Sequence, residues 1–130
     1  TRPGRPGGYL SLAAGRSMSK RIAVVISEDP RTTPRPVEAL RIALGLHAGD
    51  HKLTVILLGQ APLLLKEDVE NITDAEILEK YLPSFKHLSI PFVIEEGTVL
   101  DVGMKGFSVT TLPADDIRHF VKSVDRSLIF

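Results

Sequence analysis

The sequence predicts an α/β domain, a three-layer sandwich in which helices cover both faces of a five-stranded parallel sheet. Two apolar runs, Ile22–Ile26 and Leu53–Leu58, show no polar alternation, which is typical of strands buried on both faces. Segments with helical periodicity alternate with these strands, as in parallel-sheet proteins. The 130 residues are 43% hydrophobic and 25% charged, which suits one domain that folds without a disulfide or metal.

Each element is bounded by residues that start or stop a helix or strand. Pro36 suits the first turn of a helix, and Gly49-Asp50 ends that helix. The expected strands cover residues 22–26, 53–58, 91–94, 108–112 and 127–130. The expected helices cover residues 37–48, 61–66 (short), 73 onward, 98–105 (one helical turn, ended by Gly106) and 113 onward.

The two later helices carry recognisable start signals. Thr73 and Glu76 have the spacing of a capping box, in which each side chain bonds the other residue's backbone N–H. Pro83 should end or kink this helix, because proline lacks an N–H. Asp115 and Asp116 favour the positive end of the last helix dipole. The last helix also has an apolar stripe, formed by Ile117, Phe120, Val121 and Val124.

The helix over residues 37–48 has apolar residues on two nearly opposite faces. The first face holds Val37, Leu40, Leu44 and Ala48, and the second holds Ala39, Ile42, Ala43 and Leu46. One face packs on the sheet, and the other needs a cover that another helix of the chain or another subunit would supply. Since exposed apolar patches often mark subunit contacts, we expect a homo-oligomer or a complex.

Residues 1–19 differ in composition from the remainder, with three arginines, two prolines and four glycines. Their apolar run is too short for a signal peptide, and Arg16 interrupts the small residues after it. We expect this segment to be a disordered or cloning-derived leader, with a single domain over residues 20–130. No apolar stretch reaches the ~20 residues that a membrane helix needs, so we expect a cytoplasmic protein with no membrane partner.

Charge and cysteine content exclude several classes of function. Sixteen basic and sixteen acidic residues cancel, with no block of like charge, so nucleic acid is a poor candidate partner. The chain has no cysteine, which excludes disulfides, sulfur-ligated metals and thiol chemistry. His47 and His51 have the spacing of a metal pair, but Gly49-Asp50 ends the helix between them. We therefore expect no metal and no cofactor.

Candidate site residues lie at the carboxyl edge of the predicted sheet, where such folds bind ligands. Glu95 and Glu96 follow the third strand and would act as an acid–base pair or hold a cation, unless they are simply solvated. The loop after the first strand lies on the same edge. It has no phosphate-binding glycines, so nucleotide binding has little support. A polar pocket at this edge would combine Ser27, Glu28, Thr32, Glu95 and Thr98.

The order of segments resembles the DsrE/DsrF/DsrH-like family, with its YchN-like fold. The resemblance rests on residues 20–30, 37–46 and 53–59 at the start and on residues 114–130 at the end. It implies a parallel five-stranded sheet and assembly into homotrimers or hexamers of one or several subunit types. Some members carry sulfur as a persulfide on a cysteine just past the third strand.

This chain departs from the family at the sulfur-carrying position. Alignment of residues 90–103 puts Glu95 where the cysteine would be and Gly103 on a family glycine. A carboxylate cannot replace a thiolate in sulfur transfer. The resemblance thus implies a non-catalytic subunit or small-molecule-binding protein, alone or beside a cysteine-bearing relative. Two alternatives stay open: an enzyme using Glu95 and Glu96, and a flavodoxin-like ligand-binding regulator.

Overall fold

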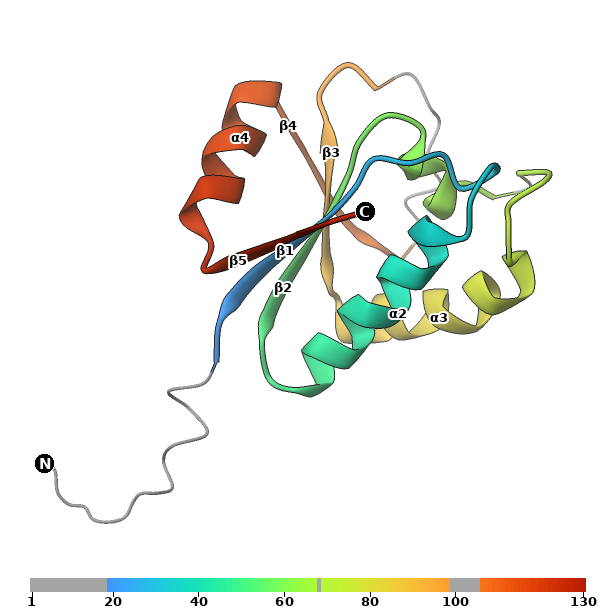
Figure 1. Cartoon of the computed structure of the whole chain (residues 1–130), viewed down its shortest axis with the longest axis horizontal. Coiled ribbons are helices and arrows are strands. Elements are labelled where there is room, and N and C mark those ends of the chain that lie inside the picture. The colour runs from blue at the N-terminus through green and yellow to red at the C-terminus, as the bar shows by residue number, and fades with distance from the viewer. Residues whose placement is uncertain (1–18, 68, 99–105) are drawn as a thin grey trace, which may run out of the picture.

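The computed structural model describes residues 19–67, 69–98 and 106–130 and contains the predicted parallel sheet (Figure 1). Its strands lie in the order β4-β3-β2-β1-β5, and every pair is parallel. Observed and predicted strand ends differ by one residue at most. The strands are β1 (Arg21–Ile26), β2 (Lys52–Leu57), β3 (Pro91–Glu95), β4 (Ser108–Leu112) and β5 (Arg126–Ile129).

Helices cover both faces of the sheet, which confirms the three-layer prediction. The helical segments are α2 (Arg35–Ala48), the 3-10 helix η1 (Ala61–Leu65), α3 (Ala75–Leu88) and α4 (Ala114–Ser123). Figure 1 shows α2 and α3 on one side of the sheet and α4 on the other. The chain steps in one direction from β1 to β4 and then returns past β1 to β5. Because parallel crossovers are right-handed, the reversed step places α4 on the opposite face.

Alternate residues of the strands build two separate apolar cores. The larger core lies under α2, η1 and α3, and it includes the fully buried rings of Phe85 and Phe92. The smaller core lies under α4, where Ile117 packs on Ala23, Val25 and other strand residues. The side-chain alternation of each strand therefore gives every strand residue a defined face.

Both apolar faces of α2 contribute buried residues to the larger core. Val37 and Leu40 from the first face are buried, and so are Ala39 and Ala43 from the second. Helix α2 contacts α3 as well as β1 and β2. Burial in one core thus explains part of the two-sided pattern, whereas Ile42 of the second face is half-buried and lies outside both cores.

The start of α3 differs from its prediction. The capping box is wrong, because the N-cap is Asp74 and no side chain caps the helix. The Thr73 N–H instead donates to the Pro30 carbonyl at 2.8 Å, and Asp74 adopts a left-handed conformation with φ of 60°. A tertiary hydrogen bond to the β1–α2 loop therefore sets the entry into α3, in place of the local box.

The end of α3 also differs, because the helix does not end at Pro83. It continues to Leu88, with Pro83 inside it. Leu78 and Phe85 anchor this helix in the larger core on either side of the proline. Their burial outweighs the loss of one backbone hydrogen bond at Pro83.

Three predictions fall wholly or partly outside the described residues. These are the leader apart from Ser19, the helical turn apart from Thr98, and the family glycine Gly103. The Ser19 hydroxyl donates to the Asp50 carbonyl at 3.0 Å. Within the described ranges, no helix is long and apolar enough to cross a membrane.

Candidate functional site

The first group of predicted site residues lies in the loop that follows β1. The Ser27 N–H and hydroxyl both donate to the Phe130 carbonyl, at 2.9 and 3.3 Å, which joins this loop to the end of β5. Glu28 forms an ion pair with Arg35 at 3.0 Å, and the Arg35 guanidinium lies 5.6 Å from the centre of the Phe130 ring. Ser27 and Glu28 are thus held by contacts that tie β1, α2 and β5 together.

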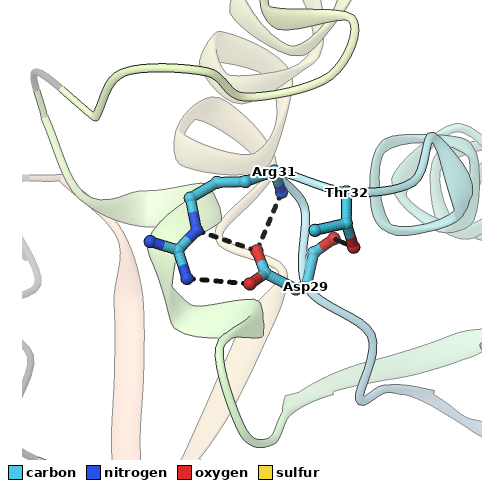
Figure 2. Close-up of polar contacts among 3 residues, drawn as sticks. All are labelled: Asp29, Arg31 and Thr32. Carbon is cyan, nitrogen blue, oxygen red and sulfur yellow. Dashed lines mark hydrogen bonds and ion pairs between the residues drawn. The ribbon is translucent and has the colours of Figure 1, made fainter.

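Thr32, the third residue of this group, belongs to a tight turn closed by an ion pair (Figure 2). The Arg31 guanidinium donates two hydrogen bonds to Asp29, at 3.0 and 2.8 Å, and the Arg31 N–H donates a third at 2.9 Å. The Thr32 hydroxyl donates to the Asp29 carbonyl at 3.2 Å. Thr32 therefore turns back on its own loop, and its hydroxyl hydrogen is already engaged.

Hydrogen bonds from Arg31 hold the pKa of Asp29 below its usual value of 3.8. A carboxyl whose pKa is lower in the folded state stabilises the fold above its unfolded pKa, and that contribution is lost as pH falls through the folded pKa. We expect acid unfolding of the native protein below about pH 4 to include this loss. In Asp29→Asn, the melting temperature should fall less between about pH 5 and about pH 2 than in the native protein. An identical pH profile would contradict this role of the pair.

The second group of predicted site residues forms a turn at the end of β3. Glu95 is the last residue of that strand, and its carbonyl accepts the Thr98 hydroxyl at 2.6 Å and the Thr98 N–H at 3.2 Å. The Glu96 N–H donates to the Leu112 carbonyl at 2.8 Å, which joins the turn to the end of β4. Gly97 takes a φ of 90°, where an L side chain would be strained.

One strand separates the two groups. The registers of β1, β2 and β3 put Ser27 and Glu95 level with each other, with Leu58 between them. Two inter-strand spacings amount to about 10 Å. Among the described residues, no hydrogen bond or ion pair joins the two groups. The structure therefore places all the predicted residues at one edge, as expected, but a shared pocket among them stays a prediction.

The chemistry open to this edge is limited by its exposure. Both Glu95 and Glu96 are exposed to solvent. A carboxylate that acts as a general acid or base usually lies in a buried environment, and Glu95 and Glu96 do not. Within the described ranges, no group of three His, Asp or Glu side chains is placed to hold a metal. His51 instead uses its Nδ1 to accept the Lys20 N–H at 3.1 Å, so it ties the start of β1.

Substitution of Glu95 with alanine is expected to leave folding nearly intact. The side chain is exposed and forms none of the ion pairs found among the described residues. Surface substitutions of this kind change the free energy of unfolding by about 0.5 kcal/mol or less. Urea unfolding measures this difference, and a loss of several kcal/mol would show that Glu95 is paired in the folded protein.

The structure also contains a cavity that the sequence analysis missed. It lies between η1, α3, the segment joining them and the residue before β4, and its volume is about 370 Å³. This volume falls within the range of small-molecule sites. Its apolar lining is Leu63, Leu64, Leu65, Val69, Ile72, Ala75, Leu78, Leu82 and Phe107, and its charged lining is Lys66, Glu67, Glu79 and Lys86.

The only sequence signal for this cavity is the run of three leucines in η1. Leu63, Leu64 and Leu65 are all buried, although a short helix on a sheet needs just one buried side. At the far end of the cavity, the Lys86 ammonium lies 4.8 Å from the centre of the Phe107 ring. Phe107 reaches this place through the crossover to β4, which no local pattern of the sequence predicts.

Comparison with known proteins agrees with this fold. No curated protein matches the chain. The crystal structure of the YchN protein from E. coli is similar, with a TM-score of 0.67 and 17% sequence identity. The similarity covers 85% of this chain and 99% of that one. The model of the DsrE/DsrF-like family matches residues 20–128. The chain therefore belongs to the DsrE/DsrF-like family.

Proposed function

We propose that this protein is a non-catalytic subunit of an oligomeric assembly related to sulfur-relay proteins, and that it carries no persulfide itself. The observation that carries the proposal is the absence of cysteine from the chain, together with Glu95 at the position where the family resemblance puts the carrier cysteine. A cytoplasmic location is part of the proposal, and its support is the lack of the cysteine pairs that oxidising compartments favour.

Partnership with a cysteine-bearing relative would restore the missing chemistry. The exposed end of β3 gives such a partner access to the turn of Glu95 and Glu96. The exposed carboxylate pair would provide negative charge that the partner recognises. The sulfur would be carried by the partner, as a persulfide on its cysteine. The alternative of an enzyme that uses Glu95 and Glu96 has weaker support, because neither carboxylate is desolvated.

Affinity co-purification of the tagged chain from its native source tests this proposal. Mass spectrometry should identify a cysteine-bearing relative or another sulfur-transfer protein, and light scattering should give a mass well above 14.2 kDa. A protein that stays monomeric and captures no relative would overturn the proposal. Glu95→Cys sharpens the test, because it should gain sulfur from the captured relative, whereas Ser108→Cys on the exposed start of β4 should gain none.

Small-molecule binding is a second candidate, favoured by the cavity beside η1 and α3. Its apolar lining and charged rim suit an amphipathic molecule. We expect the native protein to bind the dye 1-anilinonaphthalene-8-sulfonate with one-to-one stoichiometry. Ala75→Phe, which puts a ring into the cavity from α3, should weaken binding at least tenfold, and Ala48→Phe should not. Equal binding by both variants would contradict a role for this cavity.

A further inference from the structure

The folded chain separates its charges, although the sequence shows no block of either sign. At the amino ends of the strands, the Lys52 N–H donates to the Lys20 carbonyl at 2.9 Å, and Arg21 is the direct neighbour of Lys52. The Arg21 guanidinium donates to the Ser123 carbonyl at the end of α4. We define the basic corner by the cationic side chains on the α4 side of these strand ends and on the last turn of α4, which are Arg21, Lys52 and Lys122.

One carboxylate lies within the basic corner, and it is already engaged. The Arg21 N–H donates to Asp125 at 2.8 Å. This hydrogen bond lowers the pKa of Asp125, and the charges of Arg21, Lys20 and Arg126 act in the same direction. None of the corner's cations takes part in the ion pairs found among the described residues. The corner therefore keeps an excess of positive charge.

The opposite end of α4 carries the opposite sign. Glu95 is level with Leu112 at the end of β4, and α4 starts directly beyond that strand with Asp115 and Asp116. Asp115 is paired with Arg118, but Asp116 forms none of the described ion pairs. We define the acidic corner by Glu95, Glu96, Asp115 and Asp116.

The two corners lie at the two ends of one face. Helix α4 joins them, and its 10 residues span about 15 Å. This distance exceeds the Debye length of about 8 Å at physiological salt, so the corners do not neutralise each other. Part of the charge complements the dipole of α4 through Asp116 and Lys122. The charges at the strand ends, such as those of Lys52 and Glu95, do not complement a helix dipole.

The same face exposes apolar surface beside α4. Ile129 of β5 is 60% exposed and, as the neighbour of Val25, it points to the α4 side of the sheet. Leu58, Leu112 and Phe120 are half-buried on this face. In the described part of the chain, α4 is the only helix that covers it, whereas α2, η1 and α3 cover the other face.

We propose that the α4 face binds a second copy of this chain in antiparallel orientation, with the acidic corner of each copy against the basic corner of the other. A two-fold axis makes both charge contacts at once, because an isologous interface uses the same patch twice. The contact also covers Ile129. This inference rests on the proposed role as an oligomeric subunit, and it adds the surface and the symmetry. A cysteine-bearing relative that binds the turn of Glu95 and Glu96 would displace the second copy from this face.

Charge reversal at the two ends of α4 tests the arrangement in the full chain. Asp116→Lys and Lys122→Glu change exposed residues that form no described ion pair. Each variant alone should raise the dissociation constant of the native assembly at least tenfold at about 50 mM salt, where screening is weak. An equimolar mixture of the two variants should associate again as a one-to-one complex. One charge contact of that complex joins the two substituted positions, whose signs are exchanged but still opposite. The other contact joins the native Asp116 of one variant to the native Lys122 of the other. Lys80→Glu, on α3 at the other face, is the matched control and should not weaken association.

Sedimentation equilibrium and light scattering give the readout, and circular dichroism verifies that each variant is folded. Unchanged association in both reversal variants, or no recovery in the mixture, would overturn the α4-face contact while leaving assembly itself intact. A chain that binds a cysteine-bearing relative but never its own copy would also overturn it, without touching the proposed function. A native protein that neither self-associates nor captures any partner would overturn both proposals.

Discussion

Replacing Ala43 with aspartate is expected to unfold the protein under conditions where the native chain is folded. Ala43 is fully buried in α2 and is part of the larger core. Aspartate there would bury a carboxylate with no partner, and an uncompensated buried charge costs about 3–5 kcal/mol. Since small domains have about 5–15 kcal/mol of stability, this loss removes from about a fifth to all of it. Urea unfolding followed by circular dichroism measures the change.

Ala48→Asp is the matched control for this prediction. Ala48 is the last residue of the same helix and is exposed. An acid near a helix C-terminus costs about 0.3–1 kcal/mol, so this variant should stay folded. If Ala43→Asp stayed folded but lost its oligomeric state, the second apolar face of α2 would be a subunit contact after all. The two variants therefore separate burial in the chain's own core from cover by another chain.

Phe85→Ala is expected to lower the free energy of unfolding by about 3–5 kcal/mol. The Phe85 ring is fully buried and lies 5.3 Å, centre to centre, from the Phe92 ring of β3. Phe92 in turn meets Phe107 edge to face at 5.8 Å. Truncation leaves a cavity at the point where α3, β3 and the start of β4 join. Urea unfolding of the variant, with the slope compared to the native protein, measures the loss.

Ile77→Ala on the same helix provides the comparison. Ile77 is 41% exposed, so its truncation should cost less than about 1 kcal/mol. Equal losses in the two variants would mean that burial in the core does not set the cost of truncation along α3. A loss below about 1 kcal/mol in Phe85→Ala would show that the three-ring cluster is not part of the cooperative core.

Most of the fold could be predicted because strand and helix periods differ. Continuous apolar runs such as Ile22–Ile26 indicated β1 and β2, and the confirmed strand bounds are within one residue. The two-sided pattern of α2 was also visible, but it says only that a second cover is needed. Whether α3 or another subunit supplies that cover depends on the path of the chain in three dimensions, which local periodicity does not contain.

The features that could not be predicted depend on contacts between distant segments. Thr73 and Glu76 match a capping box, yet a bond from Thr73 to Pro30 sets the start of α3. Pro83 stays inside a helix because residues on both sides of it are anchored in the core. In each case a tertiary contact outweighs the local sequence preference for where a helix begins or ends.

The site was predicted in part. The rule that ligand sites lie at the carboxyl edge of parallel strands placed Ser27 and Glu95 on the same edge. The order of the strands, which sets their separation, has no local signal. The cavity lined by Leu82 and Phe107 was missed because its lining comes from η1, α3 and the crossover to β4.

The pairing of β5 with β1 has a consequence for how the chain folds. The contact between Arg21 and Asp125 spans 104 positions along the chain. Pairing of this kind raises contact order and slows folding, because a long loop must close before the contact forms. During synthesis, β1 emerges first and keeps an unpaired edge until β5 has left the ribosome. An exposed strand edge is a template for pairing with another chain, so the nascent protein is prone to aggregate during this interval.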